Sequence, residues 1–196
     1  MPRAGGVRIG VVGAAMAALS GVAAAHDTPM YVGTSSTGQL RIWFNFAEVE
    51  ELTQQQAGFP GWLSNLVTLD EVIFNDPVRD LHPITDGSKI MLEVVDFDPA
   101  LAILSPDLSV RAEAPGERIG VGTGGSQFVS DPWWYLDRTH PDFDIAQGTW
   151  EGRFKIIDLN GNHADSAVYT FTVMVPAPAS AGLLAIGVGL MSRRRR

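Results

Sequence analysis

Four histidines are the side chains of this chain best suited to bind a metal or transfer a proton. His82 and His140 each precede a proline, which favours extended or turn backbone over helix. No two histidines show the His-x-His or His-x3-His spacing, and no Glu-x-x-His pair occurs. We therefore expect most of them to be solvated loop residues.

His26 is the exception, because Ala23-Ala24-Ala25 before it fits a signal-peptide cleavage site. Cleavage after Ala25 would place an α-amine and an imidazole on one residue, and together they form a good chelate for Cu(II). The predicted partners are a second histidine and a carboxylate. These candidates are His163, His140, Asp158 and Asp165. The other interpretation of His26 is a plain polar N-terminus.

The copper hypothesis also rests on two resemblances. Lytic polysaccharide monooxygenases add a second histidine to an N-terminal one. Small periplasmic copper carriers add an Asp and a His from the last hairpin of an Ig-like sandwich. The second is the closer comparison, because His163 lies in the last predicted hairpin. Its turn is Asn160-Gly161-Asn162-His163, where the carriers use Asp-Gly-His.

Oxygen ligands for Ca²⁺ occur in the same segment. Asp158, Asn160, Asn162 and Asp165 have nearly the spacing of an EF-hand loop. The closing Glu is missing and Gly161 is out of place for that motif. Asn-Gly is also a strong hairpin-turn signal, which explains the same residues without a metal.

Aromatic residues offer a second kind of site. Trp133-Trp134-Tyr135, together with Trp150, would form a platform on which sugar rings stack, as in carbohydrate-binding modules. The alternative is that Trp134 and Trp150 fill the core of a sandwich.

Signs of catalysis are weak. The chain has no cysteine, no Gly-x-Ser-x-Gly elbow, no P-loop and no dinucleotide-binding fingerprint. Close carboxylates such as Asp96/Asp98 and Asp142/Asp144 share a strand face without implying a cleft. The glycine-rich run 120–125 is predicted to be a flexible loop. We therefore expect a protein that is not an enzyme.

Hydrophobic alternation predicts that strands position these residues. The clearest segments are 38–46, 149–158 and 167–175, each with one apolar and one polar face. Shorter strands are predicted at 30–33, 66–74, 89–97, 108–112 and 127–130. One short helix is predicted over 48–57, ending at Gly58. With 21 Gly and 12 Pro among 196 residues, turns should be frequent.

The fold class predicted is all-β, an antiparallel β-sandwich over residues 26–174. The segment from Gly148 to Val173 resembles the closing hairpin of Ig-like and PKD-like domains. In its core we expect Phe154, Ile156, Tyr169 and Phe171 to be buried, with Arg153 and Thr170 exposed.

Both ends of the chain differ from this body. Residues 1–25 are predicted to be a secretory signal peptide, with Arg3 and Arg8 before an apolar stretch from Ile9 to Leu19. Residues 175–196 combine a proline-rich breaker, eleven apolar residues from Ala181 to Met191, and Arg193–Arg196. An uncleaved N-terminal anchor and an ordinary tail anchor are the alternatives.

This C-terminal order resembles the PEP-CTERM sorting signal of Gram-negative bacteria, with Pro176-Ala177-Pro178 in place of Pro-Glu-Pro. The motif order from Gly125-Ser126-Gln127-Phe128 to Trp150-Glu151-Gly152-Arg153-Phe154 also looks like that of other exported PEP-CTERM proteins. The resemblance implies export, transient retention in the inner membrane through the C-terminal segment, and an exosortase as partner.

Charge separates the body from its ends. The two end segments hold six arginines, so the body keeps 8 of the 14 basic residues and all 22 acidic ones, a net charge of −14. Such a surface repels nucleic acid and favours solubility. The PEP-CTERM resemblance implies an exported cell-surface or matrix protein with a structural or adhesive role. Copper binding through His26 and carbohydrate binding, with extracellular polysaccharide as partner, are the alternatives.

Processing gives the first testable prediction. Export should remove residues 1–25, and sorting should later remove the Arg193–Arg196 cluster. Intact-mass measurement of protein released from the cell surface checks both cuts. A mature species that still contained Arg196 would rule out exosortase-type processing.

Overall fold

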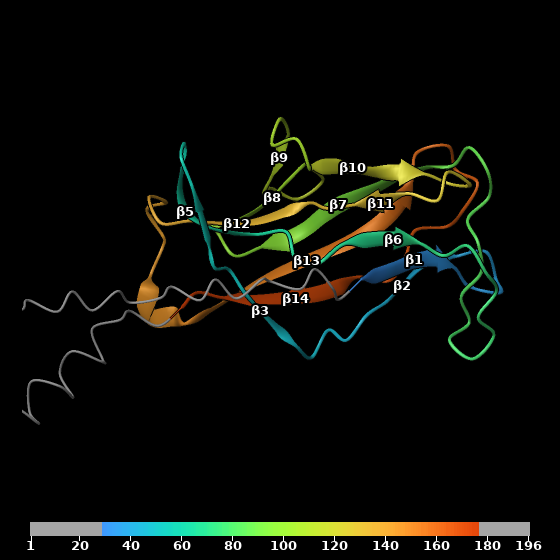
Figure 1. Ribbon diagram of the computed structural model, residues 1–196, viewed down its shortest axis with the longest axis horizontal. Helices are drawn as coiled ribbons and strands as arrows, with labels where there is room; N and C mark the ends of the chain where they lie inside the picture. The colour runs from blue at the N-terminus through green and yellow to red at the C-terminus, as the bar shows by residue number, and fades with distance from the viewer. Residues whose placement is uncertain (1–28, 177–196) are drawn as a thin grey trace, which may run out of the picture.

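Strands dominate the computed structural model, which describes residues 29–176 (Figure 1). Within this range no α-helix occurs, and the 3-10 turn Ile145–Gln147 is the helical element present. The all-β prediction is confirmed. The predicted segment 1–25, His26, and all but the first two residues of the predicted segment 175–196 lie outside the described residues. No helix within the described part is long and apolar enough to cross a membrane.

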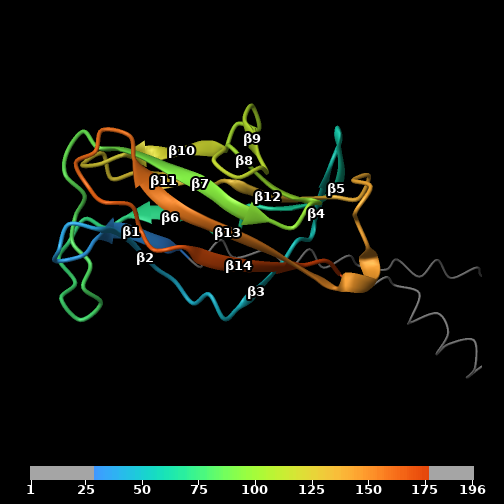
Figure 2. The same cartoon turned by 180° about the vertical axis from the view of Figure 1, so that it is seen from behind.

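A long five-stranded sheet forms one layer, with its strands side by side in Figure 2. Its order is β10 (Arg118–Thr123), β7 (Lys89–Phe97), β13 (Thr149–Asp158), β14 (Tyr169–Met174) and β3 (Val49–Glu51). The β13–β14 hairpin is antiparallel, and its register pairs Phe154 with Tyr169. Three of the long strands agree with segments predicted from alternation.

Two shorter sheets pack against the long one. The first has the order β11 (Val129–Ser130), β6 (Leu69–Glu71), β1 (Met30–Thr34) and β2 (Leu40–Trp43). The second has the order β4 (Gln54–Gln56), β5 (Phe59–Ser64), β12 (Trp133–Asp137), β8 (Leu101–Leu104) and β9 (Arg111–Ala112). Strand β13 contacts both β2 and β8, so the two short sheets cover successive parts of the same long sheet.

The core lies between these layers and takes side chains from all three sheets. On β13, Trp150, Phe154 and Ile156 are buried, as alternation predicted. Arg153 and Thr170 are exposed on the opposite face, again as predicted. Tyr169 is only half-buried, because its hydroxyl reaches the edge of β2 and accepts a hydrogen bond from the Ile42 N–H at 2.8 Å.

Three details of the sequence-based fold are wrong. The sandwich is not wholly antiparallel, since β1 pairs with β6 and β14 pairs with β3 in parallel. Residues 48–57 form no helix but the edge strands β3 and β4. The buried Leu52 joins them, and its N–H donates to the Met174 carbonyl at 2.8 Å. The free edges of β14 and β5 thus take up this segment and override its helical pattern.

The glycine-rich run is the third correction. Residues 120–123 of this run belong to β10 (Arg118–Thr123) and not to a flexible loop, while Gly124 and Gly125 lie in the turn that follows. A Cβ atom on Gly122 would lie 2.3 Å from the Phe128 ring, so glycine is needed there for the ring to pack against the strand. The register with β7 also shifts between Gly120 and Gly122. Gly122 therefore serves close packing.

The alternation of buried and exposed residues along β13 gives a prediction for the free energy of unfolding. Replacing Phe154 with Ala should destabilise the fold by about 3–5 kcal/mol, because the fully buried ring leaves a cavity. That is a large part of a stability of about 5–15 kcal/mol for a domain. Urea unfolding measures the loss. Arg153→Ala, on the opposite face of the same strand, is the matched control and should be nearly neutral. Equal midpoints for the two variants would contradict the burial pattern.

Candidate functional site

His163, a predicted copper ligand, lies in the turn between β13 and β14. Its Nε2 accepts a hydrogen bond from the Thr85 N–H at 3.1 Å, and its Nδ1 faces the Gly38 carbonyl oxygen at 3.3 Å. A neutral imidazole protonated on Nδ1 satisfies both partners. Both ring nitrogens are therefore used to hold the β13–β14 turn against two other loops.

Asp158 and its neighbours are also occupied within the fold. The Asp158 carboxylate accepts hydrogen bonds from the backbone N–H groups of Lys89, Asn160 and Asn162 at 2.9–3.1 Å. The Asn160 amide donates to the Gly87 carbonyl oxygen at 2.8 Å. These residues, proposed above as calcium ligands, connect the hairpin turn to the start of β7. Their oxygen-rich spacing is explained by this turn.

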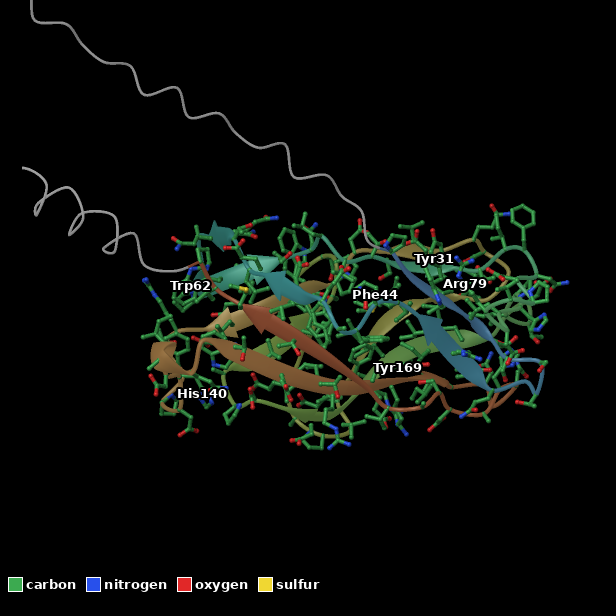
Figure 3. The ribbon with its side chains drawn as sticks, turned by 90° about the horizontal axis from the view of Figure 1, so that it is seen from below. Tyr31, Phe44, Trp62, Arg79, His140 and Tyr169 are labelled. Carbon is green, nitrogen blue, oxygen red and sulfur yellow. The ribbon has the colours of Figure 1, made fainter. Side chains whose placement is uncertain are left out.

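The remaining metal candidates do not converge with His163. The Asp165 carboxylate binds Lys155 Nζ at 2.6 Å. His140 lies beyond the opposite end of β13, a strand of ten residues that spans about 33 Å. Figure 3 labels His140 at the end of the molecule where β13 begins. Residues 29–176 contain no group of three side chains able to hold a metal ion. Copper binding by His26 stays a prediction.

The predicted sugar platform is not formed by Trp133, Trp134 and Tyr135. Trp134 and Tyr135 are 1% exposed, as is Trp150, so their ring faces cannot contact a sugar. Trp133 is half-buried, and its indole N–H donates to the Pro106 carbonyl at 3.3 Å. The reason is the central place of β12 in its sheet, where the core covers one face and a small apolar cluster covers the other.

Exposed aromatic residues lie instead on the outer face of the first short sheet. The strand registers place Val129 beside Asp70, Asp70 beside Tyr31, and Tyr31 beside Trp43, in one row across four strands. Tyr31 is 38% exposed and Trp43 40%, and their ring centroids are 5.9 Å apart. The side chains of this row point outward because Met30 and Val32, on either side of Tyr31, point into the core.

A loop after β6 forms a wall beside this row and closes a groove of about 580 Å³. We call it the Trp43 groove, and its main lining residues are Tyr31, Trp43, Phe74, Asn75, Asp76 and Arg79. The Phe74 side chain is 76% exposed. Figure 3 shows Tyr31 and Arg79 next to each other over β1 and β2.

Local hydrogen bonds hold the wall in place. Asp76 Oδ1 accepts from the Val78 and Arg79 N–H groups at 3.1 Å, and its backbone pairs with Leu81 in both directions. The Arg79 guanidinium binds Asp76 Oδ2 and lies 4.2 Å from the centre of the Trp43 ring. Arg79 therefore joins the loop to the sheet face.

Asp80 makes the second attachment. Its carboxylate accepts from the Ser36 N–H at 2.9 Å and from Arg41 at 3.2 Å, and its own φ is 52°. The hydrogen bond from Arg79 holds the pKa of Asp76 below its usual range, and the Ser36 N–H does the same for the pKa of Asp80. Both carboxylates therefore remain ionised acceptors in mildly acidic solution.

Glu71 also lines the groove, but its carboxylate is already hydrogen-bonded within the fold. Its carboxylate accepts from the Gly125 N–H at 2.6 Å and the Gln127 N–H at 2.7 Å, and the residue is buried. The groove therefore offers aromatic faces, a guanidinium and carboxylate oxygens. Alternation could have pointed to Tyr31, between two core residues. No sequence pattern links it to Phe74, which the loop brings to the same place.

Comparison with protein-family models, with curated proteins and with solved structures found no match to this chain. Function is therefore inferred from the chemistry of the residues themselves.

The histidine geometry predicts unequal effects of two substitutions. His163→Ala should lower the free energy of unfolding by about 1–2 kcal/mol, because two hydrogen bonds between distant segments are lost. His140→Ala should change the free energy of unfolding little, since the His140 ring accepts one hydrogen bond, from the N–H of nearby Asp142. Thermal and urea unfolding compare them. A His163→Ala protein as stable as the parent would contradict a clamping role for this ring.

Proposed function

We propose that this protein is an exported, non-catalytic component of the cell surface or extracellular matrix with a structural or adhesive role, and that it makes its contact through the Trp43 groove. The observation that carries the proposal is the exposed row of Tyr31 and Trp43 with the loop attached beside it. Exposed aromatic residues beside a pre-formed wall are typical of binding surfaces.

The position of the groove agrees with display from a surface. Strand β14 ends at Met174, close to where Figure 3 labels Trp62 and His140. Tyr31 and Arg79 lie in the other half of the molecule. If the segment after Pro176 holds the chain at the membrane before processing, the groove lies in the half of the molecule farther from that attachment.

Export and sorting are part of the same proposal. Residues 1–25 would act as the signal peptide and residues 175–196 as a PEP-CTERM-like segment recognised by an exosortase. The support comes from the order of charged, apolar and proline-rich segments at the two ends and from the −14 charge of the body between them, with its 22 acidic and 8 basic residues. A lasting tail anchor is the alternative for the second segment.

We further propose that the sandwich is related to Ig-like domains. In such domains the C, F and G strands lie side by side, and variable-type domains add C′ next to C. The order β10-β7-β13-β14 of the long sheet follows the same scheme, with the last hairpin as F and G. The separate second short sheet has no counterpart in that scheme.

Deleting the gene in the producing organism tests the adhesive role. The full chain should be recovered in the surface or extracellular fraction, and cells without it should adhere less and form a less cohesive matrix. Reintroducing the unaltered gene should restore both properties. Recovery of the protein only from the cytoplasm, or adhesion equal to that of the parent strain, would overturn the proposal.

A further inference from the structure

We infer that the ligand of the Trp43 groove is an uncharged, extended polysaccharide chain that lies across the strands of the first short sheet. This inference depends on the proposed function only for the statement that the groove is a contact site. The ligand class follows from the rings, the hydrogen-bonding groups and the local charge balance of the groove.

The rings are placed for stacking on sugar faces. Tyr31 and Trp43 lie on neighbouring strands, and their ring centroids are 5.9 Å apart. This spacing is close to the length of one sugar unit in an extended chain, so successive units can meet successive rings. The two rings are tilted by 35° and not stacked on each other. Tyr31 is 38% and Trp43 40% exposed, although the Arg79 guanidinium lies over part of the Trp43 ring. Phe74 adds an exposed ring on the loop side.

The polar groups of the groove suit hydroxyls, which both donate and accept hydrogen bonds. The Arg79 guanidinium has five N–H donors, and one of its nitrogens binds Asp76. Its contact with the Trp43 ring, 4.2 Å from the ring centre, holds the remaining donors at the groove. Asp76 Oδ1 already accepts from two backbone N–H groups, so Oδ2 beside Arg79 provides the carboxylate acceptor. Donors and an acceptor thus lie together beside the aromatic row.

Charge argues against an acidic polysaccharide. Both cations of this region are already paired, Arg79 with Asp76 and Arg41 with Asp80. An acidic sugar would have to replace an intramolecular carboxylate on Arg79 while approaching a body with 22 acidic and only 8 basic residues. The carboxylates near the rings are also engaged: Asp76 binds Arg79, Glu71 accepts from two backbone N–H groups, and Asp70 accepts from the Thr68 hydroxyl. A cationic chain would have to compete with these contacts.

Binding of soluble polysaccharides to the purified full chain tests the inference. The probes are hydroxyethyl cellulose as the neutral chain, polygalacturonate as the acidic chain and chitosan as the cationic chain. Affinity electrophoresis in gels containing each polymer should show retardation by the neutral chain. The dissociation constant is then measured by titration calorimetry. Retardation by polygalacturonate alone or by chitosan alone would overturn the ligand class.

Three variants assign the binding to the groove. Tyr31→Ala, Trp43→Ala and Phe74→Ala should each weaken binding of the neutral chain about tenfold, which equals about 1.4 kcal/mol. Val78→Ala is the matched control, because Val78 is 93% exposed on the same loop but does not line the groove. It should bind like the parent. Circular dichroism melting of each variant separates lost binding from lost folding.

Other outcomes distinguish this inference from the proposed function. Unchanged affinity in all three folded variants would overturn the groove as the site. Concentration-dependent dimers that the same variants dissolve would identify a second copy of the chain as its occupant and also overturn the inference. In either case the adhesion of the deletion strain decides the proposed function by itself. A neutral chain that binds, in a protein absent from the surface, would support the ligand and reject the adhesive role.

Discussion

Burial of one face of β13 is the constraint on which the rest of the structure depends. Trp150, Phe154 and Ile156 follow one another along that face, and the strand is long enough to lie under both short sheets. From the second short sheet, the Trp134 ring packs on this layer. Its centroid is 4.2 Å from that of Phe171 on β14 and 5.7 Å from that of Phe154 on β13. Neither short sheet could bury its apolar side without this shared layer.

The same aromatic packing explains which parts of the fold the sequence predicts. β7, β13 and β14 are wet on one face, so their residues alternate and the period of two is visible. Leu101–Leu104 carries no such signal, because the core covers one side of β8 and Leu63 and Tyr135 cover the other. For this reason the central strands of the second short sheet, β12 and β8, were not predicted. Segment 48–57 has a helical pattern that edge pairing with β14 and β5 overrides.

The candidate site was harder to predict than the fold, and for a related reason. A dense run of aromatics such as Trp133-Trp134-Tyr135 has the composition of a binding platform, but a central strand buries such a run on both faces. The exposed rings are dispersed along the chain at Tyr31, Trp43 and Phe74. Only strand register brings the first two together, and only the loop after β6 brings the third. Neither register nor loop path follows from local pattern.

The turn residues predicted as metal ligands show a similar principle. Asp158, Asn162 and His163 have the donor atoms of a metal site because tight turns need the same atoms to satisfy backbone N–H and C=O groups. In a chain without cysteine or disulfides, such side chains provide the links between distant loops.

Carboxylates have the same role in the wall of the Trp43 groove. Asp76 and Asp80 hold the wall loop by accepting hydrogen bonds, and Asp80 adopts a positive φ in this arrangement. A wall fixed in this way needs little further ordering when a ligand arrives, which lowers the entropic cost of binding. A flexible loop of the same composition would present Phe74 and Arg79 in many arrangements, and few of them would place Arg79 over the Trp43 ring. The positive φ of Asp80 therefore fits a surface whose geometry is fixed before a ligand binds. The charged groups of this loop fix its shape through ion pairs, in addition to favouring solubility.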